Sequence, residues 1–169
     1  MTGRGAAFLD RDGTINIKAA DGEYVSTPDE VRLLPGAAEA VRRLNDVGAL
    51  VVVVSNQRGI SLGRMTEGDL AAVHARLSDL LDAAAGGRVD VFMHCPHDIG
   101  ECDCRKPGIG MLLGAVREFP DIDPTRSVLI GDSPSDVQAG RRFGVRSLQL
   151  GVDAPDLATA VSDVIGTLS

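Results

Sequence analysis

The chain has 169 residues, 44% of them hydrophobic and 24% charged, which fits one domain of ordinary globular composition and excludes a mainly disordered protein. Its 17 Lys and Arg residues against 24 Asp and Glu residues leave a net charge of −7, which disfavours a surface that attracts nucleic acid or anionic lipid. Aromatic residues make up 3% of the chain, so it lacks the rings on which the bases of a single strand could stack.

The sequence holds no apolar run near the roughly 18 residues that a membrane helix needs, and its longest run is Ala49–Val54. Its N-terminus also lacks the charged segment and following apolar stretch of a secretory leader. We therefore expect a cytoplasmic protein, a monomer with one domain over residues 1–169, that has neither a nucleic-acid nor a membrane partner.

Short apolar runs alternate with longer amphipathic stretches, a pattern typical of a parallel sheet whose strands are joined by helices. The predicted strands are Ala6–Asp10, Leu50–Ser55, Val89–His94, Ser127–Gly131 and Ser147–Leu150. The predicted helices are Ala37–Val47, a helix that begins after Thr66, Ile109–Phe119, Ser133–Phe143 and Asp156–Ile165.

A polar insertion, residues Asn16–Glu30, follows the first strand and holds Tyr24, the only tyrosine of the chain. The insertion is too long for a tight turn and too short for a domain. It ends in Thr27-Pro28-Asp29-Glu30, a capping-box pattern that predicts a helical start.

The helix after Thr66 presents one apolar face, because its leucines and valine recur at helical spacing. The residues expected to point inward are Leu70, Val73, Leu77, Leu80 and Leu81. This leaves His74 on the helix surface, whereas His94 is expected at a strand end or in the core.

Residues suited to phosphate chemistry follow the first two strands, and the carboxyl ends of parallel strands are where such sheets bind ligands. The first strand runs into Asp10-Arg11-Asp12-Gly13-Thr14, where two carboxylates can share a hard cation and Gly13 allows a sharp turn. The second strand ends in Ser55-Asn56-Gln57, which offers a hydroxyl and two amides near N–H groups that can bind an anion. A turn flanked by aspartates and a polar helix cap are the structural alternatives.

Two further strand ends carry charged residues. After the third strand comes Arg105-Lys106-Pro107, in which we expect Pro107 to start a helix and both cations to occupy a loop at the same edge. The fourth strand ends in Gly131-Asp132-Ser133-Pro134-Ser135-Asp136, where Asp132 is a second candidate magnesium ligand and Asp136 lies one helical turn further on. A helix cap followed by proline explains the last residues equally well, and capping is compatible with catalysis.

These segments resemble the four motifs of the haloacid dehalogenase-like phosphatases. The matching residues are Phe8-Leu9-Asp10-Arg11-Asp12-Gly13-Thr14, Ser55-Asn56-Gln57, Arg105-Lys106-Pro107 and Gly131-Asp132-Ser133-Pro134-Ser135-Asp136. Within that superfamily the chain is similar to the capless branch of the D-glycero-heptose 1,7-bisphosphate phosphatases and the histidinol-phosphate phosphatases. The resemblance implies a three-layer α/β sandwich with a Rossmann-like parallel sheet of about five strands and no large cap domain. It also implies Mg²⁺ and an aspartyl-phosphate intermediate.

On this interpretation Asp10 is the nucleophile, and positive charge must surround the phosphoryl oxygens because the substrate dianion repels a carboxylate. We expect Asp10, Asp132 and the backbone carbonyl of Asp12 to hold Mg²⁺, with Lys106 and Ser55 stabilising the phosphoryl group. Asp12 acts as the general acid and base. Asp136 supports the loop or the outer ligands of the metal.

A cluster of sulfur and imidazole ligands lies in ten residues, Cys95–Cys104. Its three cysteines and His97 offer a complete tetrahedral set for a structural Zn²⁺. The four expected ligands are Cys95, His97, Cys102 and Cys104. Their spacing matches the zinc loop of the two phosphatase groups just named, and a reduced, metal-free loop is the alternative.

Without a cap domain, short loops must select the substrate, and we expect a small sugar phosphate. The residues expected to line its pocket are Tyr24, Asn56, Gln57, Arg58 and Arg105. The stretch Gly59–Gly63 resembles that of the heptose enzymes, and Arg58 adds a cation that could meet a second phosphate. The sequence therefore favours removal of the C7 phosphate from a heptose bisphosphate.

Three alternatives remain. The first is a histidinol-phosphate phosphatase. Only four residues separate His97 from Cys102, which is nearer to that group than to the heptose enzymes, and the stretch Gly108-Ile109-Gly110 also differs from the heptose enzymes. A phosphoryl-accepting receiver domain also uses an aspartate and Mg²⁺, but it lacks an acid/base carboxylate at the position of Asp12. A non-catalytic zinc module is the third alternative.

Overall fold

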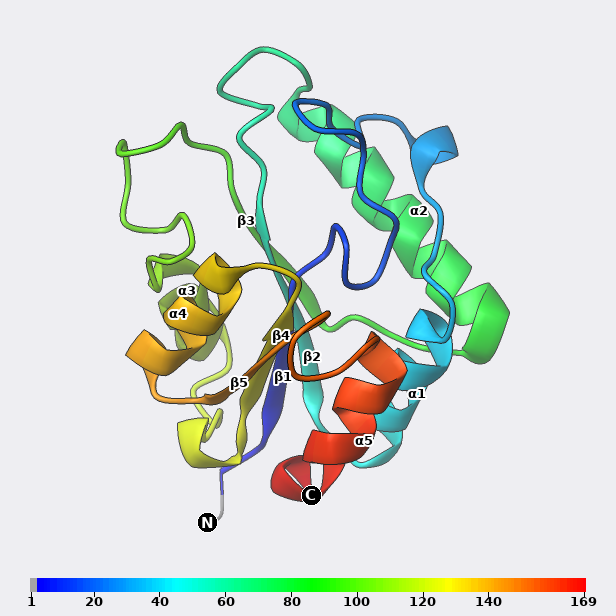
Figure 1. The fold of residues 1–169 in the computed structure, drawn as a ribbon, viewed down its shortest axis with the longest axis vertical. Helices are drawn as coiled ribbons and strands as arrows, with labels where there is room; N and C mark the ends of the chain where they lie inside the picture. Colours follow the sequence, from blue (N-terminus) through cyan, green and yellow to red (C-terminus); the bar gives the residue numbers. More distant parts are fainter. Residues whose placement is uncertain (1–2) are drawn as a thin grey trace.

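Five parallel strands form one sheet in the computed structural model, which describes residues 3–169 (Figure 1). The strands are β1 (Ala6–Leu9), β2 (Leu50–Asn56), β3 (Val91–Cys95), β4 (Val128–Gly131) and β5 (Arg146–Gln149), in the order β3-β2-β1-β4-β5. The helices are α1 (Ala37–Asp46), α2 (Glu67–Ala85), α3 (Gly110–Glu118), α4 (Pro134–Phe143) and α5 (Leu157–Leu168), with 3-10 turns η1 (Pro28–Glu30) and η2 (Pro124–Arg126).

Helices cover both faces of the sheet, which confirms the three-layer α/β sandwich (Figure 1). Ala7 and Leu9 join a buried cluster with α1, α2 and α5, whereas Ala6 and Phe8 join a second cluster with α3 and α4. Because successive side chains of a strand point to opposite faces, β1 is apolar on both. This is why its sequence is a continuous apolar run.

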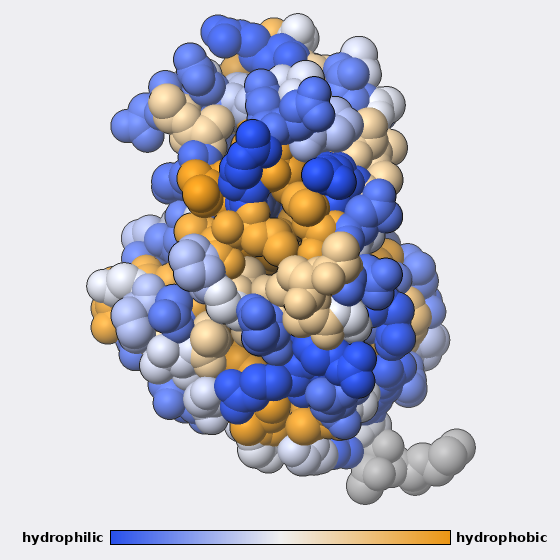
Figure 2. Space-filling model, turned by 90° about the vertical axis from the view of Figure 1, so that its right-hand side faces the viewer, coloured by the Kyte–Doolittle hydropathy of each residue, from blue (hydrophilic) through white to orange (hydrophobic). Residues whose placement is uncertain are grey.

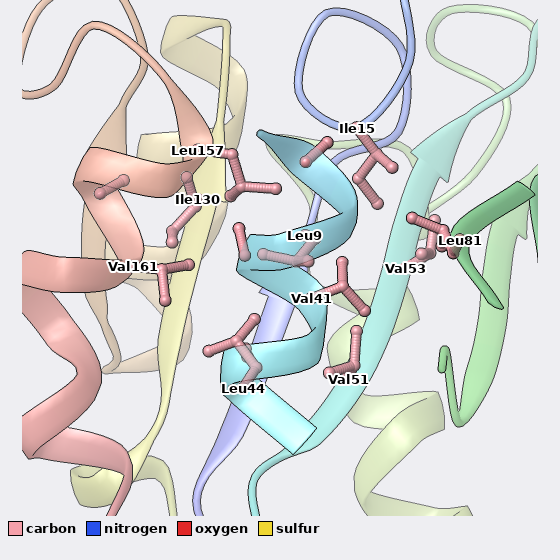
Figure 3. Close-up of a cluster of buried hydrophobic side chains, with 14 of the residues drawn as sticks. Leu9, Ile15, Val41, Leu44, Val51, Val53, Leu81, Ile130, Leu157 and Val161 are labelled. Atoms are coloured by element: carbon pink, nitrogen blue, oxygen red, sulfur yellow. The ribbon is translucent and has the colours of Figure 1, made fainter. Parts of the chain in front are cut away.

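The cluster under α1 shows how the layers are held together (Figure 3). Leu9, Val53 and Ile130 of the sheet meet Val41 of α1 and Val161 of α5, and all of them are inaccessible to solvent. Viewed from the side of α1 and α2, the surface is largely hydrophilic, with apolar residues gathered near mid-height (Figure 2). Among residues 3–169, no helix combines the length and apolar character required to cross a membrane.

The strand order determines where a ligand can bind. The chain builds β1, β2 and β3 in one direction across the sheet and then adds β4 and β5 on the other side of β1. The loops that follow β1 and β4 therefore diverge, and ligands of open parallel sheets bind in the crevice at such a switch point. Over residues 3–169 no large cap domain covers this edge.

The predicted elements are all present, with differences at their ends. The third strand begins at Val91 rather than Val89, because the Asp90 carboxylate accepts the Val51 N–H at 2.8 Å and takes the place of a backbone partner. The capping box over Thr27–Glu30 is confirmed, but it begins only the short turn η1.

His74 is not on the helix surface as predicted. It is 8% exposed, and its ring stacks on Phe92 of β3 with the ring centres 4.2 Å apart. The helical spacing of α2 identified the leucine face correctly, but it could not show that the edge strand β3 lies beside this helix position. His94 lies in β3 as expected, where its Nε2 pairs with a Glu67 carboxylate oxygen at 2.7 Å.

Candidate active site

The predicted catalytic residues converge at the carboxyl edge of the sheet. Asp10 follows β1, Ser55 lies near the end of β2, and Asp132 follows β4. Their strands are adjacent in the sheet, with β1 between β2 and β4. The site therefore occupies the switch point identified above.

Lys106 is the buried centre of this site. It is 4% exposed, and its ammonium donates to Asp10 Oδ1 at 2.7 Å, Asp136 Oδ1 at 2.6 Å and the Val54 carbonyl at 2.7 Å. Three acceptors satisfy the three N–H donors of a lysine. The nucleophile candidate and the lysine, which are 96 residues apart in sequence, thus share one hydrogen bond.

Charge crowding shapes the ionisation of this pair. Burial raises the pKa of Asp10 to about 8; the Lys106 ammonium acts against this shift, and the carboxylates of Asp136 and Asp132 add to it. Burial would lower the pKa of Lys106, but Asp10 and Asp136 hold it above its ordinary value. The site therefore favours a lysine cation and has carboxylates in excess.

Three carboxylates are arranged so that a cation could bind them together. Asp10, Asp132 and Asp136 each have an oxygen within 4.8 Å of the others. Gly13 has a φ of +84°, and a Cβ at this position would overlap the Asp132 carboxylate, so the loop after β1 approaches that group closely. Clustered carboxylate oxygens are the ligands that Mg²⁺ prefers, and this donor set fits the ion.

Asp12 accepts hydrogen bonds from a set of donors that does not include Lys106. Arg11 donates to both Asp12 oxygens through Nη2, at 2.9 and 3.0 Å, while Asn16 Nδ2 donates at 2.9 Å and Gln57 Nε2 at 3.1 Å. Arg11 is inaccessible to solvent, and a bidentate pair of this kind fixes a carboxylate in orientation. Arg11 was not among the predicted site residues; the signal for it is a cation between two aspartates at the end of a buried strand.

The three polar residues after β2 connect the parts of the site. Gln57 Nε2 also donates to Ser55 Oγ at 2.5 Å, so one amide contacts both Asp12 and Ser55. Asn56 exchanges two hydrogen bonds with the Lys106 backbone, accepting its N–H at 2.9 Å and donating to its carbonyl at 3.2 Å. Asn56 thereby fixes the backbone from which the lysine extends.

Pro107 does not start a helix, contrary to prediction. It lies in a turn closed by the Gly108 N–H, which donates to the Arg105 carbonyl at 2.7 Å, and α3 begins only at Gly110. The two cations before it also separate. Lys106 enters the site, whereas Arg105 lines a different hollow with Cys102 and Arg142.

The mouth of the site is a hollow of about 250 Å³ lined by the insertion, by the loop after β1 and by the last residue of β2. Asp12, Asn56 and Tyr24 of the insertion are among the residues that line it. Arg58 forms an ion pair with Asp98 of the cysteine loop, Cys95–Cys104. Tyr24 of the insertion therefore lines the mouth of the site as expected, whereas Arg58 and Arg105, which were also expected there, do not line this hollow.

The cysteine cluster has the geometry of a closed metal site. Cys95 Sγ lies 3.4 Å from Cys102 Sγ and 3.0 Å from Cys104 Sγ, and His97 Nδ1 lies 3.1 Å from Cys104 Sγ. The four ligand atoms all lie within 4.8 Å of one another, and the three cysteines are free thiols. Ligands about 2.3 Å from a central Zn²⁺ would lie somewhat under 4 Å apart, so the set fits this ion.

A family model described as "Polynucleotide kinase 3 phosphatase" matches residues 6–153. The chain belongs to this family of haloacid dehalogenase-like phosphatases. A D-glycero-beta-D-manno-heptose-1,7-bisphosphate 7-phosphatase of Rhodopseudomonas palustris is 38% identical over 170 residues, which cover 96% of this chain and 91% of that relative. Membership of this enzyme family sets aside the receiver-domain and zinc-module alternatives.

Two further relatives bear on this phosphatase. A D-glycero-alpha-D-manno-heptose-1,7-bisphosphate 7-phosphatase of Mycobacterium bovis is 41% identical over 132 residues, or 78% of this chain and 68% of the relative. The crystal structure of a D,D-heptose 1,7-bisphosphate phosphatase from B. bronchiseptica, complexed with magnesium and phosphate, superposes with a TM-score of 0.79. That chain is 30% identical, and the match covers 96% of this phosphatase and 98% of the solved one.

Proposed function

We propose that this phosphatase removes the C7 phosphate of a D-glycero-heptose 1,7-bisphosphate through an aspartyl-phosphate on Asp10. The observation that supports the chemistry is the convergence of Asp10 and Lys106, 2.7 Å apart, beside the carboxylates of Asp132 and Asp136. The substrate is inferred from relatives at 38 and 41% identity that bear this name.

In the first half of the reaction Asp10 attacks phosphorus and the bond from phosphorus to the C7 oxygen breaks. Lys106 offsets charge on the phosphoryl oxygens, and Ser55 donates to one of them. Asp12 gives a proton to the departing C7 oxygen, for which it must turn from the Gln57 amide toward Asp10.

In the second half Asp12 takes a proton from the water that attacks phosphorus, and the bond between phosphorus and Asp10 breaks. Phosphate leaves, and Asp10 is again a carboxylate paired with Lys106. Arg11, which donates to both Asp12 oxygens, limits how far this carboxylate can turn.

We assign two metals to the chain. Asp10, Asp132 and the Asp12 carbonyl would hold Mg²⁺, with Asp136 beside them, and the ion would neutralise phosphoryl charge that repels the nucleophile. A structural Zn²⁺ on Cys95, His97, Cys102 and Cys104 would fix the loop from which Lys106 extends.

We also propose that residues 1–169 act as one phosphatase domain, as a monomer in the cytoplasm. Three free thiols in one loop suit a reducing compartment.

The test is phosphate release from both anomers of the heptose bisphosphate and from histidinol phosphate, with and without Mg²⁺. We expect kcat/KM for one heptose anomer to exceed that for histidinol phosphate by about a hundredfold or more, with activity lost without Mg²⁺. Faster hydrolysis of histidinol phosphate would favour the histidinol-phosphate alternative. Equally slow rates on every ester would contradict both.

A further inference from the structure

A second lysine contacts the carboxylate cluster from the insertion. Lys18 Nζ lies 3.2 Å from Asp132 Oδ2, and the Lys18 side chain is 60% exposed. It differs from Lys106, which is buried and shared among three acceptors. An exposed ion pair of this kind is weak, so a divalent cation would replace it readily.

Lys18 also lines the hollow at the mouth of the site. The polar residues around this hollow are Asp12, Lys18, Asp21, Glu23, Tyr24 and Asn56. Within this lining, which lies wholly in the described chain, Lys18 is the only cation. Asp12, Asp21 and Glu23 would repel a substrate that brings a second phosphate into the hollow.

The two arginines expected at the pocket contact other groups. Arg58 forms an ion pair with Asp98, and Arg105 lines the hollow that contains Cys102 and Arg142. Neither lines the hollow that contains Asp12. Lys18 is therefore the cation best placed for a second anionic group of the substrate.

We propose that Lys18 is a specificity-determining residue, which pairs with Asp132 when the cation site is empty and with the second phosphate of the substrate when Mg²⁺ is bound. This inference rests on the proposed function. The ammonium of Lys18 and Mg²⁺ repel each other at Asp132, so metal binding frees the lysine for the hollow. A substrate with one phosphate would gain nothing from it.

The first arm of the test compares Lys18→Met with the wild-type enzyme on the heptose 1,7-bisphosphate and on the heptose 7-phosphate. We expect the ratio of the two kcat/KM values to fall about tenfold in Lys18→Met, because a lysine–phosphate contact is lost. Lys18→Arg should retain most of the ratio. Arg76→Met, which removes an exposed cation from α2, should leave the ratio unchanged. An unchanged ratio in Lys18→Met would overturn the proposal.

The second arm needs no substrate. The affinity for Mg²⁺ is measured by calorimetry, and the affinity for Mn²⁺ by electron paramagnetic resonance. We expect the Kd of Lys18→Met to be lower than that of the wild type by at least about threefold, because the competing ammonium is gone. An unchanged or weaker affinity would overturn the exchange at Asp132.

A failure of the proposed function can be distinguished from a failure of the Lys18 proposal. If the wild-type enzyme does not hydrolyse the heptose bisphosphate, the substrate assignment fails. The Lys18 proposal is then decided on the phosphomonoester that the enzyme does hydrolyse, by comparing that ester with its counterpart carrying a second phosphate. A ratio that stays the same in Lys18→Met overturns the proposal there as well.

Discussion

At the scale of single residues, a substitution of Asp12 tests whether the two aspartates after β1 have different roles, Asp10 as the nucleophile and Asp12 as the general acid and base. Asp12→Asn keeps a side chain that can accept from Arg11, but it can no longer exchange a proton with the substrate. We expect kcat to fall by about 10²–10⁴-fold, with Mg²⁺ affinity changed by less than about threefold. Steady-state kinetics and Mg²⁺ calorimetry measure the two effects.

The matched control is Asp10→Asn, which should abolish both phosphate release and the covalent intermediate. A large loss of Mg²⁺ affinity in Asp12→Asn, equal to its loss of activity, would show that the Asp12 side chain serves the metal instead.

His74 should make the fold sensitive to acid. Burial lowers the pKa of His74 to about 3, with the Arg11 guanidinium adding to the shift, whereas an unfolded histidine titrates near 6.5. The unfolded chain therefore binds a proton first, and stability falls as the pH drops from about 6.5 toward 3. Between pH 6.5 and 5 this amounts to about 2 kcal/mol.

Urea unfolding at pH 7 and pH 5 measures this contribution. His74→Leu, which keeps an apolar side chain against Phe92, should lose about 2 kcal/mol less than the wild type over the same pH step. Equal losses in the two proteins would mean that His74 becomes protonated without cost in the folded state.

At the scale of elements, Tyr24 of the insertion packs against Gly59 in the loop after β2. A Cβ at Gly59 would lie 2.8 Å from Cγ of Tyr24, closer than packed carbon atoms approach each other. Gly59→Ala should therefore displace Tyr24 from the mouth of the site. We expect KM to rise about tenfold with kcat changed by less than about threefold, because Lys106 and Asp10 are untouched.

Gly68→Ala is the control, since its Cβ would make only an ordinary contact, 3.6 Å from Thr66 Oγ1. In a Tyr24→Ala background, Gly59→Ala should have no further effect on KM. An independent effect there would indicate that the glycine acts on the backbone of the loop.

The cysteine loop, Cys95–Cys104, should support both stability and rate through its proposed zinc, because Cys104 is separated from Lys106 by only Arg105. We expect Cys104→Ser to lower the Tm by on the order of 10 °C and kcat by about tenfold or more. The zinc content, the Tm and kcat are measured on the same preparation, by elemental analysis, calorimetry and steady-state kinetics. This shows whether the losses of Tm and kcat follow the loss of zinc. Asp103→Ser changes an exposed residue between two ligands and should retain one zinc per chain. Full activity in zinc-free Cys104→Ser would contradict a supporting role.

At the scale of the whole molecule, Mg²⁺ should stabilise the fold. Its expected ligands come from the ends of β1 and β4, and the bound ion would offset the excess negative charge of these carboxylates. Binding to the folded state alone adds about 2.7 kcal/mol at a hundred times the Kd, so the Tm should rise with Mg²⁺. Asp132→Asn should lose this response and the exposed variant Asp163→Asn should keep it. An equal rise in both variants would mean that Mg²⁺ binds elsewhere.

The amino-acid sequence alone predicted a parallel sheet whose strands are joined by helices, because short apolar runs alternate with amphipathic stretches of helical period. It also determined which residues are chemically equipped for phosphate transfer, since the aspartates after β1 and β4 stand at strand ends. Only the tertiary structure decided what each of these side chains contacts. The burial of His74, the separation of Arg105 from Lys106 and the pairing of Lys18 with Asp132 depend on residues distant in sequence. Such contacts leave no periodic signal, because they arise only when separate loops meet at one edge of the sheet.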